Sequence, residues 1–157
     1  MHPVVLAGLA AGTLDIIAAG TLTVWRGGTT VRMLQGIAGG LVGPDLAFQG
    51  GLATAALGLG LHFFIAFTAA AVFYAASRKL PTLLRRALIW GALYGVAVYF
   101  FMSRVVVPLS RLPPRPPTTS VTMILIHIFC VGLPIALLIR RGLPRLRRVG
   151  SAHTRGK

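Results

Sequence analysis

Four long apolar runs dominate this sequence and limit what the chain can fold into. They cover roughly residues 4–25, 51–76, 87–107 and 120–139. A helix needs about 20 mainly apolar residues to cross the hydrocarbon core of a bilayer, and each run reaches that length. The runs are apolar on all sides, whereas a helix of a soluble protein carries one apolar stripe. We therefore expect an all-α integral membrane protein with four transmembrane helices.

The charges agree with this class of protein. Sixteen basic residues face only two acids, Asp15 and Asp45, and the net charge is +14. A soluble chain of that charge would suggest a nucleic-acid partner. Here the bases lie in clusters between the apolar runs, where membrane proteins keep them. We expect the clusters to set the topology and to contact anionic lipid, with no nucleic acid as a partner.

The distribution of the bases predicts an orientation. Residues 78–86 and 140–157 hold eleven of the sixteen bases, and these two segments lie on the same side of a four-span topology. The positive-inside bias then places both termini and the middle loop in the cytoplasm. The first 25 residues contain no Lys or Arg, so the first run lacks the charged start of a signal peptide and is expected to stay as a span. We predict one transmembrane domain, residues 1–144, and a disordered basic tail, residues 145–157.

The first loop, residues 26–49, contains a glycine-rich segment that is too short to span. We expect residues 31–42 to form an interfacial or re-entrant segment.

The second and fourth runs share a pattern that suggests an internal repeat. One contains Leu61-His62-Phe63-Phe64 and the other contains Ile126-His127-Ile128-Phe129, each followed by bases and a proline. The first and third runs share Gly-x-x-x-Gly spacings, Gly8 with Gly12 and Gly91 with Gly95. We expect two parallel-repeat helical hairpins, in which His62 and His127 lie at equal depth. Chance similarity in low-diversity apolar sequence is the alternative.

Each run carries one polar residue near the middle of the membrane. From the helical rise of 1.5 Å per residue, Asp15, His62, Tyr99 and His127 lie within roughly 6 Å of one level. Ionisable groups cost about 2.5–3.5 kcal/mol at the bilayer centre on insertion scales, so they should face protein and find partners. Small residues, which let helices approach closely, surround these positions. The expected packing glycines are Gly8, Gly12, Gly58, Gly91 and Gly95. The alternative for each polar residue is a hydrogen-bonded packing role.

Asp15 is the sharpest candidate for a functional group. Buried among small residues, its carboxyl would be neutral, or ionised only beside a protonated histidine. His62 and His127 could join a proton relay. Alternatively, the two imidazoles could bind a b-type haem or a metal ion. No serine lies centrally in a run, and only one carboxylate does, so we expect neither an enzyme nor a bound cofactor.

From Leu61 to Arg141, the chain resembles the YagU-type family of little-characterised bacterial inner-membrane proteins. The resemblance rests on His62, Pro81, Gly91-Ala92-Leu93, Pro108-Leu109, Pro113-Pro114, His127 and Arg140-Arg141. It covers about half of the chain and leaves Asp15 unmatched. It implies a helical protein of the bacterial inner membrane and supports a role for both histidines.

The sequence thus favours a small inner-membrane protein with a polar mid-membrane site for a proton, an ion or a small solute. A permeation role would suggest a homo-oligomer, because four short helices make a thin pore wall. The first alternative is a non-catalytic subunit or assembly partner of a larger membrane complex. The second is a haem-binding or redox protein that uses His62 and His127.

Overall fold

The computed structural model describes residues 1–114 and 119–154, and it contains helices but no strands in these ranges. Its elements, in chain order, are α1 (Pro3–Trp25), α2 (Thr30–Val42), α3 (Pro44–Gln49), α4 (Gly51–Lys79), α5 (Thr82–Arg85), α6 (Ala87–Phe101), the π-helical η1 (Met102–Val106), α7 (Val107–Leu109), α8 (Val121–Ile126), the π-helical η2 (His127–Gly132) and α9 (Leu133–Thr154).

Four helical stretches in the described ranges are long and apolar enough to cross a membrane. They are Pro3–Trp25, Gly51–Lys79, Ala87–Leu109 and Val121–Leu143. The prediction of four such helices is confirmed. The second helix extends beyond its apolar run through Arg78 and Lys79, since basic side chains interact favourably with the C-terminal end of a helix.

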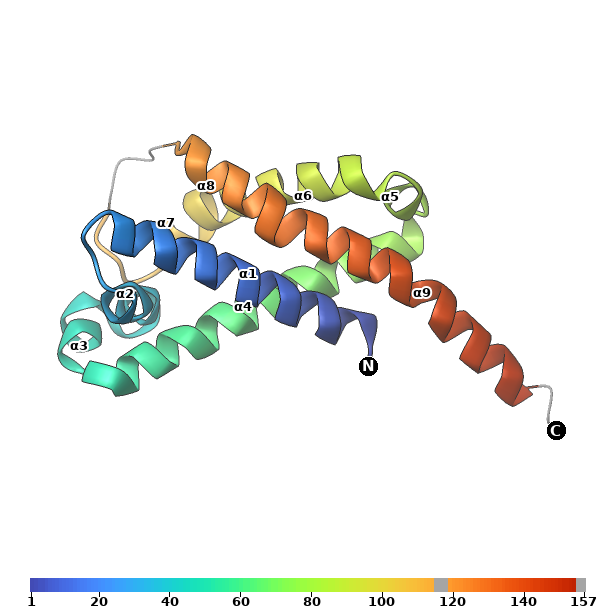
Figure 1. The fold of residues 1–157 in the computed structure, drawn as a ribbon. Helices are drawn as coiled ribbons and strands as arrows, with labels where there is room; N and C mark the ends of the chain where they lie inside the picture. Colours follow the sequence, from blue (N-terminus) through green and yellow to red (C-terminus); the bar gives the residue numbers. More distant parts are fainter. Residues whose placement is uncertain (115–118, 155–157) are drawn as a thin grey trace.

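The four long helices form an elongated bundle whose members alternate in direction (Figure 1). Helices α2 and α3 lie at one end of the bundle, whereas α5 and the C-terminal part of α9 lie at the other. The end that carries α5 gathers exposed basic residues from two segments: Arg78, Lys79, Arg85, Arg86, Arg140 and Arg141. The topology therefore places these two basic segments at the same end of the molecule.

Helices α1 and α4 pack through glycines on α1 and aromatic rings on α4. A Cβ atom added at Gly8 would collide with the ring of Phe67, and one added at Gly12 would lie 2.7 Å from the ring of Phe63. Because these positions have no side chain, the two rings lie directly against the backbone of α1. The helices therefore approach closely at this level.

Helix α6 packs even more closely against the fourth long helix. An added Cβ at Gly95 would lie 2.5 Å from the carbonyl oxygen of His127, and one at Gly91 would lie 3.1 Å from that of Gly132. Gly132 in turn faces the backbone of Gly91 and Gly95. Backbone thus contacts backbone, which only glycine allows.

The first loop folds into α2 and α3, and these helices pack against the N-terminal half of α4. The side chain of Thr29 caps α2, and Gly43, with a φ of +92°, links α2 to α3 in a conformation that favours glycine. The side chain of Gln35 is buried and donates a hydrogen bond to the carbonyl oxygen of Gly51 at 3.0 Å. Gly58 of α4 lies against the backbone of Leu34. These contacts fix the segment that the sequence predicted to be interfacial or re-entrant.

The structure describes the backbone of the predicted tail, residues 145–157, as far as Thr154. The backbone of α9 stays helical from the fourth long helix through Thr154. Arg, Leu and Ala are strong helix formers, and the preceding helix provides a nucleus on which more turns can be added. Residues 155–157 of the predicted tail lie outside the described residues.

Candidate functional site

Three of the four predicted polar residues line one cavity at the centre of the bundle. The cavity has a volume of about 120 Å³ and receives side chains from all four long helices and from α2. We call it the polar cavity. Its lining residues are Ala11, Gly12, Asp15, Ile37, His62, Ile65, Ala66, Ala69, Val98, Met102, His127 and Val131. Asp15, His62 and His127 are its titratable members, and the rest of the lining is apolar.

His62 is held by the backbone of the neighbouring helix. Its Nε2 lies 2.8 Å from the carbonyl oxygen of Gly12. A carbonyl oxygen only accepts, so the ring must donate the Nε2–H. In the neutral imidazole, Nδ1 is therefore the nitrogen without a proton. Only 13% of the His62 side chain is exposed.

Asp15 lies one helical turn beyond Gly12 and faces the free nitrogen of His62. Its Oδ2 is 4.0 Å from Nδ1 of His62, and 16% of the Asp15 side chain is exposed. The separation exceeds hydrogen-bonding distance, so the two groups face each other without a direct hydrogen bond. The other carboxyl oxygen, Oδ1, is buried without a hydrogen-bond partner among the described residues.

His127 uses the opposite ring nitrogen for its structural bond. Its Nδ1 lies 2.8 Å from the carbonyl oxygen of Met123 on the preceding turn. Nδ1 therefore carries the proton, and Nε2 is the nitrogen that is unprotonated in the neutral ring. His127 also begins the π-helical segment η2. Such widened turns are frequently found at functional sites.

Tyr99 lies beside the polar cavity rather than in its lining. Its ring meets the ring of His127 edge-on, with centroids 5.5 Å apart. Its hydroxyl oxygen accepts the backbone N–H of Ser120 at 2.9 Å, and Ser120 is the residue that caps α8. Tyr99 thus contacts both the ring of His127 and the start of the fourth long helix. Tyr99 therefore contacts a residue of the cavity lining without lining the cavity itself.

The cavity brings together side chains that can hold protons. Each histidine commits one nitrogen to a backbone carbonyl and keeps the other as a basic lone pair, and Asp15 adds a carboxyl group. The part of the chain that the structure describes contains no group of three or more His, Cys, Asp or Glu residues arranged to hold a metal ion. The geometry offers proton acceptors in a largely apolar surrounding, where charge is expensive.

Two apolar residues that enclose the polar cavity were not among the predicted site residues. Ile37 reaches it from α2, and Met102 reaches it from the first turn of η1. Neither residue differs in type from its apolar neighbours. The carbonyl group of Met123 orients His127. Because it belongs to the backbone, the type of the residue does not indicate this role.

Comparisons with protein-family models, with curated proteins and with solved structures find no match to this chain.

Proposed function

We propose that this chain is a multi-pass membrane protein whose polar cavity binds a proton or a small cation inside the bilayer. The observation that carries the proposal is the convergence of Asp15, His62 and His127 on one cavity of about 120 Å³. These residues are 47 positions or more apart in pairs, and three different long helices supply them. Ionisable groups in a membrane interior are costly and usually mark ion or proton sites.

The chemistry of the three groups favours a positive guest. The Nδ1 of His62 and the Oδ2 of Asp15 face each other across 4.0 Å, and each of these atoms can accept a proton or a hydrogen bond. The buried Oδ1 of Asp15 adds another acceptor without a partner among the described residues. A proton on His62 would convert the pair into an ion pair, and a proton on Asp15 would supply the missing donor. Binding of one positive charge therefore supplies a partner for acceptor groups that face each other.

Reconstitution into liposomes tests this function. Proton flux is followed with an enclosed pH-sensitive dye under a potassium diffusion potential, and the same vesicles report sodium and potassium flux. We expect proton or cation flux in the wild type and a loss of about tenfold or more in Asp15→Asn and His62→Gln, since charged-group interactions of about 1.5–3 kcal/mol are lost.

His2→Gln is the matched control. His2 lies outside the polar cavity, and its ring accepts the N–H of Val4 at the start of α1. We expect its flux to equal that of the wild type. Wild-type flux no greater than that of empty liposomes, or unchanged flux in the cavity variants, would refute the permeation role.

We also propose that the two helical hairpins are related by an internal repeat. The support is that the glycines of both hairpins contact residues at the same spacing from the histidine of the partner helix. Gly8 and Gly12 meet Phe67 and Phe63, which follow His62 by five residues and by one. Gly91 meets Gly132, five residues after His127, and Gly95 meets Ile128, one residue after it. The same Gly-x-x-x-Gly spacing thus meets the same positions relative to each histidine.

The orientation with cytoplasmic termini and a place in the bacterial inner membrane belong to the same proposal. The exposed basic residues at the α5 end support them through the positive-inside bias.

The haem alternative is less favoured by the geometry. Ligand pockets usually have about 300–1,000 Å³, whereas the polar cavity has about 120 Å³. A Soret band after haem-replete expression would reverse this preference. A role as subunit of a larger complex would be favoured by a stoichiometric partner that remains bound during purification in detergent.

A further inference from the structure

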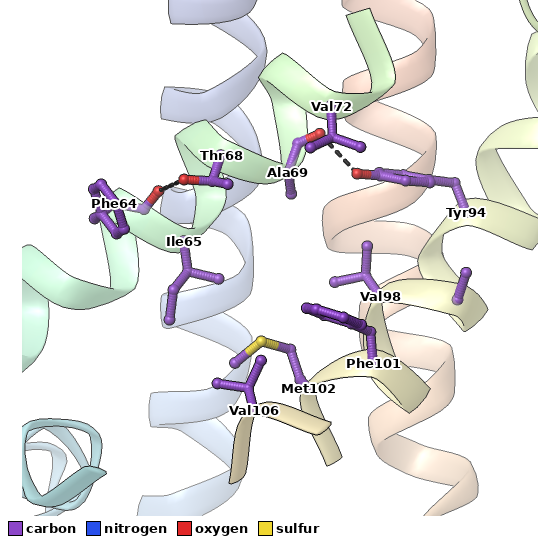
Figure 2. A pocket seen from close by; sticks show the side chains of 11 residues that line it. Phe64, Ile65, Thr68, Ala69, Val72, Tyr94, Val98, Phe101, Met102 and Val106 are labelled. Carbon is purple, nitrogen blue, oxygen red and sulfur yellow. Dashed lines mark hydrogen bonds between the residues drawn. The ribbon is translucent and has the colours of Figure 1, made fainter. Parts of the chain in front are cut away.

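A second hollow, the apolar groove, lies between α4 and α6 (Figure 2). It is open at the surface, since its lining residues Phe64, Val72 and Phe101 are exposed. It has a volume of about 520 Å³. Its walls run from Phe64 to Val72 on α4 and from Tyr94 to Val106 on α6 and η1. Val106 follows Tyr94 by twelve positions, which corresponds to about 18 Å along a helix. The groove is therefore long enough to hold much of one hydrocarbon chain.

The groove offers no polar group to a guest, because its two hydroxyls are already used. Thr68 donates to the carbonyl oxygen of Phe64 at 2.8 Å, and Tyr94 donates to that of Ala69 at 2.7 Å (Figure 2). The Tyr94 bond also ties α6 to α4 at one end of the groove. Everything else that lines the groove is apolar. Its chemistry thus matches the acyl interior of a bilayer.

The apolar groove and the polar cavity share a wall. Four side chains line both hollows: Ile65, Ala69, Val98 and Met102. Ala69 is small, and Met102 has a flexible thioether side chain that adapts to irregular spaces. A rotamer change of Met102 or Ile65 is a far smaller movement than a helix displacement. A lipid-like molecule whose hydrocarbon chain lies in the groove can therefore place a small polar head group in the cavity.

The cavity defines the chemistry of that head. Its polar atoms are acceptors: the Nδ1 of neutral His62 and the buried Oδ1 of Asp15, which has no partner among the described residues. Buried acceptors without donors are costly, so a guest that donates a hydrogen bond is favoured. A hydroxyl group donates one hydrogen bond and fits a volume of about 120 Å³. A hydrocarbon without a head would leave the acceptors unpaired.

We infer that the polar cavity and the apolar groove together form a site for a membrane-soluble long-chain alcohol, with its hydroxyl in the cavity and its chain in the groove. This inference rests on the proposed polar site and names a lipid ligand for it. The hydroxyl donates to His62 or Asp15, and the chain lies against α4 and α6. The alcohol reaches the site sideways from the bilayer.

The test uses the full chain in nanodiscs and a hexadecan-1-ol probe that carries a diazirine in mid-chain. Photolysis should attach the probe to residues 64–72 and 94–106, as located by peptide mass spectrometry. Unlabelled hexadecan-1-ol should prevent labelling at a concentration about tenfold lower than hexadecane, which is the effect of about one hydrogen bond. Equal competition by the alcohol and the alkane, or labelling spread evenly over the lipid-facing surface, would overturn the inference.

Two exposed alanines provide a matched pair of variants. Ala97 lines the groove, whereas Ala56 lies on α4 outside the groove, and both are exposed. Ala97→Phe should reduce labelling about tenfold by filling the groove, and Ala56→Phe should not change it. Unchanged labelling in Ala97→Phe would count against the site.

The proton flux of the wild-type protein separates this inference from the proposed function. Wild-type flux combined with equal competition by alcohol and alkane rejects the alcohol site alone. Selective labelling by the alcohol in a protein without flux supports the alcohol site and rejects permeation.

Discussion

The imidazole of His62 donates its Nε2–H to the carbonyl oxygen of Gly12, 2.8 Å away on the neighbouring helix α1. Gly12 makes this possible because the ring of Phe63, the residue after His62, lies where a Cβ of residue 12 would be. One close helix contact therefore both packs α1 against α4 and fixes the ring of His62. The same bond turns Nδ1 of the ring toward Asp15.

The two histidines should have opposite tautomers when they are neutral. His62 should carry its proton on Nε2, and His127 should carry its proton on Nδ1, because each of these nitrogens faces a carbonyl oxygen. ¹⁵N chemical shifts of protein labelled at the imidazole nitrogens, measured in nanodiscs at alkaline pH, report the tautomers. Gln substitutions at each position assign the signals. Two identical tautomers would contradict the geometry of the polar cavity.

The sequence predicted the four long helices well, because the length of an apolar run depends on the thickness of the bilayer and on nothing else in the fold. The ends were less predictable, since a helix continues past its apolar run for as long as hydrogen bonds and good helix formers allow. Lys79 and Leu143 lie beyond the predicted ends of their spans for this reason. The helices of the first loop depend on contacts with α4, such as the bond from Gln35 to Gly51, which no local pattern reports.

The sequence predicted that Asp15, His62, Tyr99 and His127 lie near one another, because counting residues along each helix gives the level of a side chain. The structure brings Asp15, His62 and His127 to one cavity. The direction around each helix depends on packing, which leaves Tyr99 outside the lining of the polar cavity. The apolar groove was not predictable either. It arises from the spatial relation of α4 and α6, and its residues resemble any others that face lipid.

Replacement of Asp15 by alanine should make the protein more stable while it removes the proposed function. The Oδ1 atom of Asp15 is buried and has no partner among the described residues, and a lone buried acceptor costs about 1–3 kcal/mol. Alanine fits a face of α1 that already carries Ala11 and Gly12. We expect a higher midpoint of thermal unfolding in detergent, measured by circular dichroism, together with loss of flux.

Asp45→Ala is the control for this stability change. Asp45 is exposed in the first turn of α3, where its charge favours the helix N-terminus by about 0.3–1 kcal/mol. Its replacement should leave the midpoint unchanged or lower it slightly. A clear fall in the midpoint of Asp15→Ala would show that the carboxyl group has a stabilising partner.

Gly95→Ala should separate α6 from the fourth long helix. The new methyl group would lie 2.5 Å from the carbonyl oxygen of His127 and 2.7 Å from the Cα of Ile128. Since both atoms belong to backbone, the helices must move apart, and overpacking of this kind costs about 1–3 kcal/mol. The unfolding midpoint in detergent measures the loss. Movement of His127 should also reduce proton flux.

Gly60→Ala provides the opposite case on α4. A Cβ atom at Gly60 meets nothing within 4 Å, and alanine is a better helix former than glycine by about 0.8–1.0 kcal/mol in a helix interior. This variant should be as stable as the wild type or more stable. If Gly95→Ala were tolerated equally well, the backbone contact between α6 and the fourth long helix would be wrong.

Tyr99→Phe should loosen the start of the fourth long helix. The hydroxyl of Tyr99 accepts the backbone N–H of Ser120 at 2.9 Å, so its removal leaves a donor unpaired at an expected cost of about 1 kcal/mol. Hydrogen exchange of the Ser120 amide should become about fivefold faster, because that cost reduces its protection. Tyr94→Phe is the matched variant, since the hydroxyl of Tyr94 bonds the carbonyl of Ala69 instead. It should lower the unfolding midpoint by a similar amount and leave Ser120 exchange unchanged. Equal exchange of Ser120 in both variants would place the hydroxyl of Tyr99 away from this amide.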